Sequence, residues 1–537
     1  MISNLASRLA LIQDNSYVAG ASPPTRKMGR QIASHGFLES LRRHGGGNPH
    51  LLKAKLPSPT LRALENPWEA LFCGDPNLHP FANERLWNDP RRYSLIGITH
   101  TLSTPGPLQI LTNLPQTPLH SWDSLICTSQ AAKSAVEMLW DHSEALTRLR
   151  GGQPAERPQL PVIPLGIDAD GFKPVCSRRE ARKRLRISSD AAVVLWTGRL
   201  ELHCKAHHGS SFRAMAHAAA ACPKRPWVLL MYGTAVMPSI PPALKQAATE
   251  LCPDVDVRVL DGQDLPLGAL ARAASDMALS LVDCLQETFG LTPIEAMASG
   301  LPVVVSDWNG YRDTVVEGQT GHRIATHSFQ PGWSDSNLQQ LALSEADLDR
   351  VSARISGQIG VDALSAGAAL ARLADSPALA VGMGALGRQR VKQNYDWKVV
   401  LNQYSELLDL LADRRRHAMK SARYAHLAGM KPIPALSQIF KAWPSHVISD
   451  RNAIHACGNK SDLIRQLQLE MVVIYRNELP PVSLILKAFI KLQSLGHASL
   501  RELKENKLTC WSTSERQHLA EALGWLLKHG FAEVAQS

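Results

Sequence analysis

The sequence lacks the features that mark membrane-spanning and secreted proteins. None of its apolar runs approaches the roughly 20 residues that a helix needs to cross a bilayer. The short apolar stretch of Met1–Leu11 is interrupted by Asn4, Ser7 and Arg8. We therefore expect neither a transmembrane helix nor a secretory signal. Internal repeats and low-complexity tracts are also absent from the sequence.

The cysteines show neither an even count nor a paired spacing. There are nine of them, and no two form a C-x-x-C pair. This argues against a disulfide framework and against a zinc ribbon, and it predicts a reduced, cytoplasmic protein. The nine positions are Cys73, Cys127, Cys176, Cys204, Cys222, Cys252, Cys284, Cys457 and Cys510.

Acidic residues are too few to balance the basic ones, which leaves a formal net charge of +10. Nucleic acid, anionic lipid headgroups and phosphorylated substrates would each suit basic patches. An ordinary solvated face explains them equally well. Part of the excess lies in two clusters, Arg26, Lys27, Arg30, Arg42, Arg43, Lys53 and Lys55 near the start and Arg414, Arg415, Arg416, Lys420 and Arg423 further on.

A chain of 537 residues is too long for one hydrophobic core, so two or three domains are expected. Between about residues 190 and 320, short apolar runs alternate with helix-like segments, which predicts a doubly wound parallel α/β domain. The predicted strands are Ala191–Trp196, Trp227–Met231, Val255–Leu260, Met277–Leu281 and Pro302–Val305, and the predicted helices are Ser211–Cys222, Pro242–Leu251, Leu267–Ala274 and Pro293–Ser299.

The same alternation is fainter upstream, where a smaller α/β domain is expected. The Gly- and Pro-rich stretch Gly151–Pro161 is the natural linker between the two. We therefore predict domains at 1–160, 161–412 and 431–537. The upstream strands would be Leu9–Ile12, Ala70–Cys73, Leu95–Thr99 and Leu125–Thr128, with helices at Lys27–Arg42 and Gln130–Trp140.

The tail changes character and predicts a mainly helical appendage. Three helices, Ser483–Leu492, Leu500–Glu505 and Thr513–Lys528, precede a turn at Gly530 and a short strand. This order is similar to the end of a winged-helix module. No helix of the tail carries a run of Arg and Lys, so we expect a protein partner rather than nucleic acid.

The segment from Gln286 to Val305 is the most informative part of the chain. It predicts a strand end, a glycine-containing loop, a helix and a further strand. The free amides of Gly290, Leu291 and the helix start would form an anion site beyond the carboxyl end of the strand. Thr292 is a candidate N-cap, with Pro293 at the first helical position.

Two glutamates, Glu287 and Glu295, flank this loop with seven residues between them. Beside a phosphate site, one carboxylate could accept hydrogen bonds from ribose hydroxyls and the other from a sugar. Alternatively, Glu295 only caps its own helix.

The segment resembles the E-x7-E region of family 4 of the retaining glycosyltransferases. Glu287, Glu295, the Phe-Gly-Leu between them and Glu295–Val304 carry the likeness. The resemblance covers roughly residues 90 to 410. It implies an α/β protein of GT-B type, in which two Rossmann-like doubly wound domains face a cleft. Further matching stretches are Val162–Pro174, Trp196–Leu200 with Lys205, and Tyr395-Asp396-Trp397 with Tyr404 in a helix that returns to the first domain.

The resemblance also implies roles for individual residues. Arg199 and Lys205 would neutralise the diphosphate as negative charge develops on the leaving group. Glu287 would hold the donor sugar and Glu295 the ribose, while His100 would lie near the reacting carbon. No metal and no cofactor are implied, and we interpret Asp168-Ala169-Asp170 as a chance D-x-D match. The remaining donor contacts would be Thr288, Phe289, Gly290, Leu291, Gly198 and Gly29.

The N-terminal loop departs from the family pattern. Of the two glycines expected before the first long helix, only Gly29 is available, followed by Arg30. His207 and His208 are also unusual, and they would either contact an acceptor or reshape their loop.

Retaining transfer from a nucleotide sugar to a glycan, lipid-linked or polysaccharide acceptor is therefore the predicted function. Peripheral contact with the inner face of a membrane is the expected association. An epimerase would need acid and base carboxylates in the first half, which we do not find. A catalytically silent, sugar-nucleotide-binding scaffold with a partner-binding tail is the main alternative.

Overall fold

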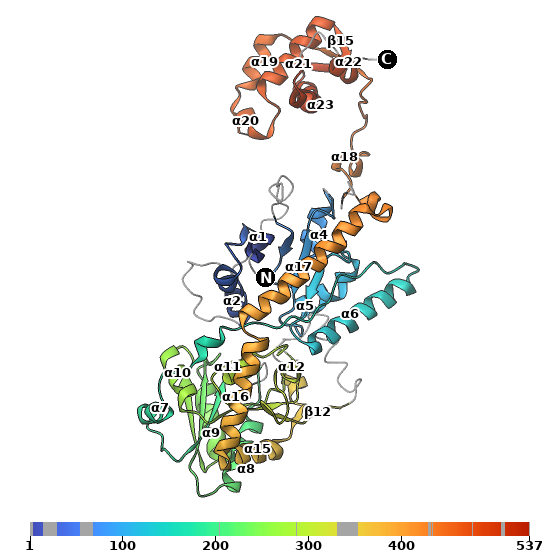
Figure 1. The fold of residues 1–537 in the computed structure, drawn as a ribbon. Coiled ribbons are helices and arrows are strands. Elements are labelled where there is room, and N and C mark those ends of the chain that lie inside the picture. The colour runs from blue at the N-terminus through green and yellow to red at the C-terminus, as the bar shows by residue number, and fades with distance from the viewer. Residues whose placement is uncertain are drawn as a thin grey trace. The chain divides into compact units, whose positions relative to one another are not determined.

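The computed structural model describes residues 4–13, 29–53, 68–87, 89–202, 205–285, 287–329, 353–427, 431, 433–474, 476–505 and 511–535. The chain forms two compact units, Met1–Pro432 and Ile433–Ser537. The first unit contains two parallel sheets and the second a small antiparallel sheet (Figure 1).

The first sheet has five parallel strands in the order β2-β1-β3-β4-β5. Its strand order reverses between β1 and β3, as in a doubly wound domain. The predicted segments form four of these strands, while β2 was missed because only two apolar residues mark it. The strands are β1 (Leu9–Gln13), β2 (His50–Lys53), β3 (Ala70–Phe72), β4 (Ser94–Ile98) and β5 (Ser124–Ile126), and the helices are α1 (Leu5–Arg8), α2 (Gly29–His44), α4 (His79–Leu86), α5 (Pro105–Asn113), η1 (Leu114–Gln116) and α6 (Gln130–Leu149).

The second sheet has six parallel strands in the order β11-β10-β9-β6-β7-β8. All the strands and helices predicted between residues 190 and 320 are present, with ends shifted by a few residues. The strands are β6 (Ala192–Thr197), β7 (Trp227–Gly233), β8 (Val255–Asp261), β9 (Met277–Ser280), β10 (Val303–Ser306) and β11 (Gly321–Ile324), and the helices are α7 (Arg178–Leu185), α8 (Gly209–Ala221), α9 (Ile240–Leu251), α10 (Leu265–Ala274), α11 (Leu291–Ala298), α12 (Tyr311–Thr314), α15 (Ala363–Asp375) and α16 (Pro377–Asn394).

The two sheets turn their carboxyl ends toward each other. The Thr288 hydroxyl, beyond β9, donates to the backbone oxygen of His100, beyond β4, at 2.6 Å. The Ser129 hydroxyl, beyond β5, donates to the backbone oxygen of Thr288, also at 2.6 Å. The backbone N–H of Gln130 donates to Asp313, beyond β10, at 2.7 Å. These contacts confirm two Rossmann-like domains that face each other, the arrangement of a GT-B fold.

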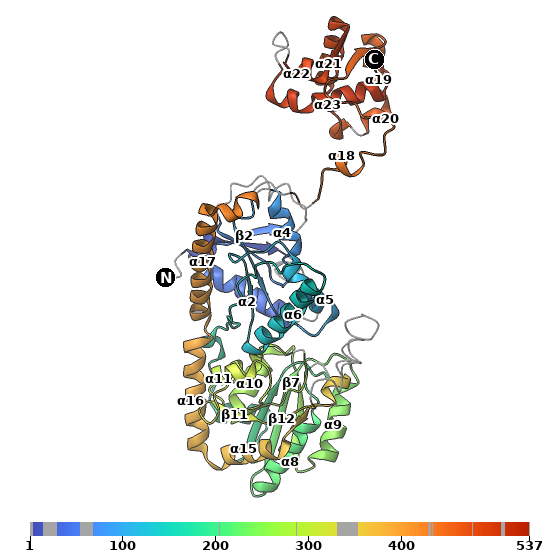
Figure 2. The ribbon, with the colours of Figure 1, turned by 90° about the vertical axis from the view of Figure 1, so that its right-hand side faces the viewer.

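Helix α17 (Trp397–Lys420) follows α16 and packs its buried face against the first domain. Figures 1 and 2 show α16 and α17 following one another along the side of both domains. The ring of Tyr404 lies 4.8 Å from that of Phe37 and 6.0 Å from that of Phe72. This confirms the predicted returning helix, which extends to Lys420. A short helix, η3 (Ala422–Leu427), follows it.

The second unit contains a three-stranded antiparallel sheet in the order β15-β14-β16. The tail helices lie where they are predicted, and the central strand β14 comes from upstream of them. Leu484, Phe489, Leu519, Leu523 and Leu526 are buried in its core. The elements are α18 (Leu436–Ile439), β14 (Ala453–Ala456), α19 (Lys460–Leu467), α20 (Glu470–Val473), η4 (Arg476–Glu478), α21 (Val482–Leu495), β15 (His497–Ser499), α22 (Leu500–Glu505), α23 (Thr513–Lys528) and β16 (Ala532–Val534).

No helix among the described residues is long and apolar enough to span a membrane.

Candidate active site

Two neighbouring strands mark the place where the second sheet reverses its order. The chain runs outward from β6 through β7 to β8, and then returns to the other side of β6 with β9. Loops beyond the carboxyl ends of such strands diverge and leave room for a ligand. Arg199 and Lys205 follow β6, and Glu287 follows β9, so the predicted charged residues lie at this point of the sheet.

A close backbone contact holds the loop after β6. Gly198 has a φ of +152°, a conformation that side chains disfavour. A Cβ atom added to Gly233 would lie 1.9 Å from the backbone oxygen of Gly198. Glycine is therefore required at 233, and the loop crosses directly over the end of β7.

Lys205 and Glu287 form an ion pair across the two loops. The Lys205 Nζ atom lies 2.6 Å from Glu287 Oε2, and the two side chains are 28% and 13% exposed. Burial acts to lower the pKa of Lys205, but the charge and hydrogen bond of Glu287 raise it above its ordinary value. Lys205 therefore stays cationic at neutral pH in a partly desolvated site.

Arg199 adds a second positive charge near this pair. Its Nη1 atom lies 3.0 Å from Glu201 Oε2, and its side chain is one-third exposed. The charge of Arg199 acts on Lys205 in the direction that lowers the pKa of the lysine. The two cations therefore belong to the same group of loops at the end of β6.

Helix α11 begins earlier than predicted. Its first residue is Leu291, and its N-cap is Gly290 with a φ of +87°. The expected Thr292 N-cap is therefore wrong. The first amides of a helix have no partner within it, and here they belong to Leu291 and Thr292 because Pro293 has no N–H.

This earlier start changes the interpretation of Glu295. A capping-box glutamate occupies the third helical position, whereas Glu295 occupies the fifth. Its carboxylate therefore does not cap the helix. Burial raises the pKa of Glu295 to about 7, and the charge of Arg272 offsets only part of that effect. A ligand that donates hydrogen bonds would stabilise the carboxylate.

Two of the predicted donor contacts have other roles in the structure. The side chain of Phe289 is only 2% exposed and belongs to the core of the second domain, so a donor contact at this position would come from its backbone. The hydroxyl and backbone oxygen of Thr288 are both used in the bonds to the first domain. The loop is thus anchored on one side in the core and on the other in the facing domain.

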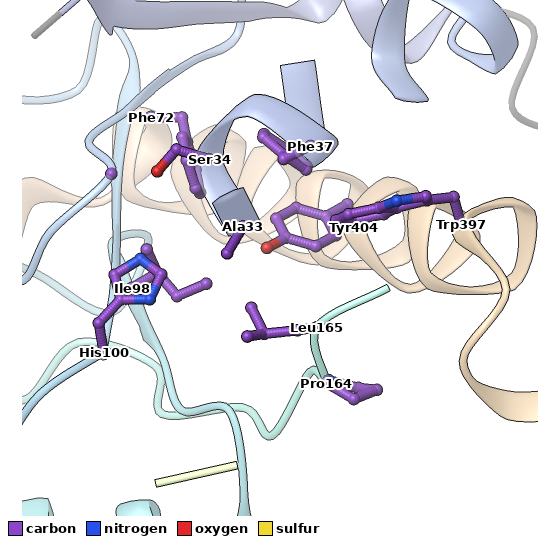
Figure 3. Close-up of a pocket in the computed structure, with 11 residues that line it drawn as sticks. Ala33, Ser34, Phe37, Phe72, Ile98, His100, Pro164, Leu165, Trp397 and Tyr404 are labelled. Carbon is purple, nitrogen blue, oxygen red and sulfur yellow. The ribbon is translucent and has the colours of Figure 1, made fainter. Parts of the chain in front are cut away.

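His100 lies at the edge of a small pocket between the first domain, the segment at Pro164 and Leu165, and α17 (Figure 3). In that view its ring lies near Ile98, away from Trp397. The cavity measures about 10 Å³, room for about one water molecule. A sugar does not fit there, so a ligand contact by His100 would lie outside this pocket.

Three residues of the site were missed by sequence reasoning. Asp283, 3% exposed, follows β9 and accepts the N–H of His207 at 3.2 and 3.3 Å. Burial raises the pKa of Asp283 to about 7. The Tyr311 hydroxyl lies 2.9 Å from Ser280 Oγ, and Asn309 bonds the backbone oxygen of Glu287. The sequence signal that could have identified Asp283 is its position as an acidic residue within the mainly apolar run 277–284.

The two unusual histidines differ from each other. His207 is exposed, while His208 is 1% exposed and lies against Trp196. Burial lowers the pKa of His208 to about 3, so its ring is neutral. His208 therefore shapes the loop from inside.

Other predicted features lie outside the site or outside the described residues. Gly29 begins α2, and the loop before it is not among the described residues. Asp168 caps η2 (Ala169–Phe172), and Asp170 pairs with Lys173 and Lys392. Among the second basic cluster, Arg415 donates to the backbone oxygen of Glu69 and to Ser94.

The candidate site lies within a segment that matches a known protein family. Residues 191–338 match the family described as Glycosyl transferases group 1. That segment contains Arg199, Lys205, Glu287 and Glu295.

Two curated relatives share the description D-inositol 3-phosphate glycosyltransferase. The protein from Corynebacterium aurimucosum is 30% identical over 285 residues, which cover 52% of this chain and 62% of the relative. The protein from Mycobacterium tuberculosis strain F11 is 30% identical over 218 residues, covering 40% and 42%. The chain thus spans less than two thirds of the length of either relative.

Two solved structures are similar at low identity. Anabaena HepE in complex with UDP gives a TM-score of 0.48 at 17% identity, over 75% of this chain and 99% of that one. Sucrose-phosphate synthase from Thermosynechococcus elongatus gives 0.47 at 19% identity, over 76% and 99%.

Proposed function

We propose that the protein is a glycosyltransferase that moves a sugar from a nucleoside-diphosphate sugar to an acceptor hydroxyl. The observation that carries this proposal is the Lys205–Glu287 ion pair at the strand-order reversal. It lies within the segment matched to group 1 glycosyl transferases. The site places a cation beside an acid, both positioned by loops beyond a parallel sheet.

Without a donor, Glu287 neutralises Lys205. A diphosphate that binds beside the two cations would form ion pairs with Lys205 and Arg199. The Glu287 carboxylate would then be able to accept hydrogen bonds from sugar hydroxyls. As the bond from the anomeric carbon to the diphosphate breaks, the cations stabilise the charge on the leaving oxygen. Because Lys205 and Arg199 supply this charge, the proposal requires no metal and no cofactor.

The nucleoside end of the donor would extend along α11. The amides of Leu291 and Thr292 are suited to a phosphate oxygen, and Gly290 and Gly198 let the backbone approach it. Glu295, one turn along the same helix, would accept hydrogen bonds from the two ribose hydroxyls. This would offset the burial that raises its pKa to about 7.

The proposed stereochemical outcome is retention. The acceptor oxygen would bond the anomeric carbon on the face that the diphosphate leaves, and its proton would pass to the leaving phosphate. His100, in the facing domain, would lie near the reacting carbon. Gly29 would contribute backbone at the start of α2.

The proposed acceptors are a glycan, a lipid-linked sugar or a polysaccharide, at the cytoplasmic face of a membrane. D-inositol 3-phosphate belongs among the compounds tested, because the curated relatives carry that name. Peripheral membrane contact through the basic clusters would appear as binding to anionic but not to neutral vesicles.

The test begins with thermal unfolding of the full chain in the presence of UDP, GDP, ADP and their sugar conjugates. A ligand at a hundred times its Kd adds about 2.7 kcal/mol. One nucleotide sugar should raise Tm, and Glu287→Ala/Glu295→Ala should abolish that shift. Lys392→Ala, which removes a lysine that pairs with Asp170 away from this site, is the control.

Product formation is then measured with the donor so identified, and the anomeric configuration is read by NMR. A retained configuration supports the mechanism, and an inverted one overturns it. Donor binding without transfer to any acceptor would favour the scaffold alternative. No response to any nucleotide would contradict the donor site itself.

A further inference from the structure

The sheet of the second unit brings together three side chains that can ligate a metal. The ligand atoms of His455, Cys457 and Glu533 all lie within 4.8 Å of one another. His455 Nε2 is 3.7 Å from Glu533 Oε2, with the side chains 39% and 71% exposed. Among the described residues, these are the His, Cys, Asp and Glu side chains that meet in a group of three or more.

Strand register explains why these residues meet. His455 on β14 is the Cα partner of Glu533 on β16. Directly opposite residues of antiparallel strands share one face of the sheet, with Cβ atoms about 4.5–5.5 Å apart. Cys457 lies two residues after His455 and so returns to that face. Its backbone N–H donates to the Phe531 carbonyl at 3.0 Å, which fixes its position beside β16.

A fourth candidate lies on the other side of the central strand. His497 on β15 is also a Cα partner of His455. His497, His455 and Glu533 therefore form one row across all three strands. The His497 side chain is exposed, so a change of rotamer can turn its ring toward the other ligands without disturbing the core.

We propose that His455, Cys457 and Glu533 bind a divalent transition metal of the zinc type, with His497 as the fourth ligand. Thiolate, imidazole and carboxylate together suit zinc. With metal–ligand bonds of about 2.0–2.3 Å, tetrahedral ligands lie about 3.3–3.8 Å apart. The His455–Glu533 distance already matches, and no pair among His455, Cys457 and Glu533 exceeds the upper limit by more than about 1 Å, since all their ligand atoms lie within 4.8 Å.

The expected role of the metal is structural. The two edge strands, β15 and β16, have only three residues each, and the metal would connect both to β14. Four protein ligands leave no open position, which is typical of structural zinc. This inference is independent of the proposed sugar transfer.

The experiment uses the full chain, stripped with a chelator and dialysed against zinc. We expect about one zinc per chain, and a Co2+-loaded sample should show an intense near-ultraviolet thiolate band with tetrahedral visible bands. Cys457→Ser should remove the thiolate band and weaken zinc binding at least tenfold. Cys176→Ser, which removes another partly exposed free cysteine, should change neither.

Glu533→Gln and His497→Asn separate ligand loss from misfolding, because both side chains are exposed. With native far-ultraviolet circular dichroism, each should still weaken zinc binding, and His497→Asn should alter the visible cobalt bands. Zinc that binds wild type and Cys457→Ser equally, or that does not bind the stripped protein, would overturn the proposal. Unchanged binding and cobalt spectrum in His497→Asn would overturn the assignment of the fourth ligand.

Discussion

The two Rossmann-like domains differ in how firmly they hold their loops. In the second, strands of four to seven residues end in loops fixed by close glycine contacts. In the first, strands have three to five residues, and the contacts at the domain junction include backbone atoms of His100 and Gln130. The charged residues of the candidate site, Arg199, Lys205, Glu287 and Glu295, all belong to the second domain.

The largest expected effect on stability comes from breaking the close contact of Gly290, which positions the loop after β9 in the second domain. A Cβ at Gly290 would lie 2.0 Å from Tyr311 Cε1, at a φ of +87°. Gly290→Ala should lower the free energy of unfolding by about 3 kcal/mol or more, through strain and overpacking. Denaturant unfolding measures this.

Gly300→Ala is the matched control, because Gly300 has a φ of +82° but no neighbour within 4 Å of an added Cβ. It should cost only the strain, about 1–2 kcal/mol. In the first sheet, Gly97→Ala would meet Asp75 O at 3.0 Å and should also cost less. Equal losses at all three positions would contradict the comparison.

Removing a charge of the second domain should have the next largest effect. If Lys205 acts as proposed, Lys205→Ala should lower kcat about a hundredfold, or about 2.7 kcal/mol, because a preorganised positive charge at the leaving group would be lost. Lys392→Ala should leave kcat unchanged. A Lys205→Ala enzyme with normal kcat and raised KM would instead indicate a role in ground-state binding.

Glu295 should make the stability of the second domain depend on pH. Its folded pKa of about 7 lies above the ordinary value, so the folded state binds more protons between about pH 4.5 and 7. Stability is therefore lost as pH rises through this window. Glu295→Gln should raise the free energy of unfolding by about 1–3 kcal/mol at pH 8 and change it little at pH 4.

Asp283, whose pKa is also about 7, requires its own control. Asp283→Asn should keep the part of the pH dependence that belongs to Glu295. If Glu295→Gln leaves the dependence of the unfolding free energy on pH unchanged, the carboxyl group of Glu295 is not the source of that dependence.

The smallest expected effect is at the contact between the two domains. Thr288→Val removes the hydroxyl that bonds the His100 carbonyl and should cost about 1 kcal/mol. Thr249→Val removes an exposed hydroxyl that bonds Lys245 O within its own helix, and should cost less. Denaturant unfolding of both variants would show whether the junction contributes to stability.

Sequence reasoning succeeded where periodicity is strong. The alternating runs from 190 to 320 predicted every described strand of that range and four of its five described helices, because the parallel strands are rich in apolar residues. The short helix α12 (Tyr311–Thr314) was missed. It failed at β2, where only Leu51 and Leu52 are apolar. The start of α11 was also misplaced, because a glycine N-cap at a positive φ leaves no side-chain signal for Gly290.

The candidate site was partly predictable in the same way. The motif identified Lys205 and Glu287, which the structure pairs at 2.6 Å. It could not tell that Phe289 is buried in the core or that Thr288 bonds the first domain, because both depend on neighbours far along the chain.

The sequence alone determined the alternation of apolar and polar segments and the order of the charged residues along the chain. It also determined that a glycine-containing loop at Gly290 precedes a helix. Local periodicity and composition encode these. Only the tertiary structure decided which charges meet and which carboxyl groups are buried. It also decided that His455, Cys457 and Glu533 share one face. Such groupings depend on strand order and register, which join residues that are separated by tens of positions and share no local pattern.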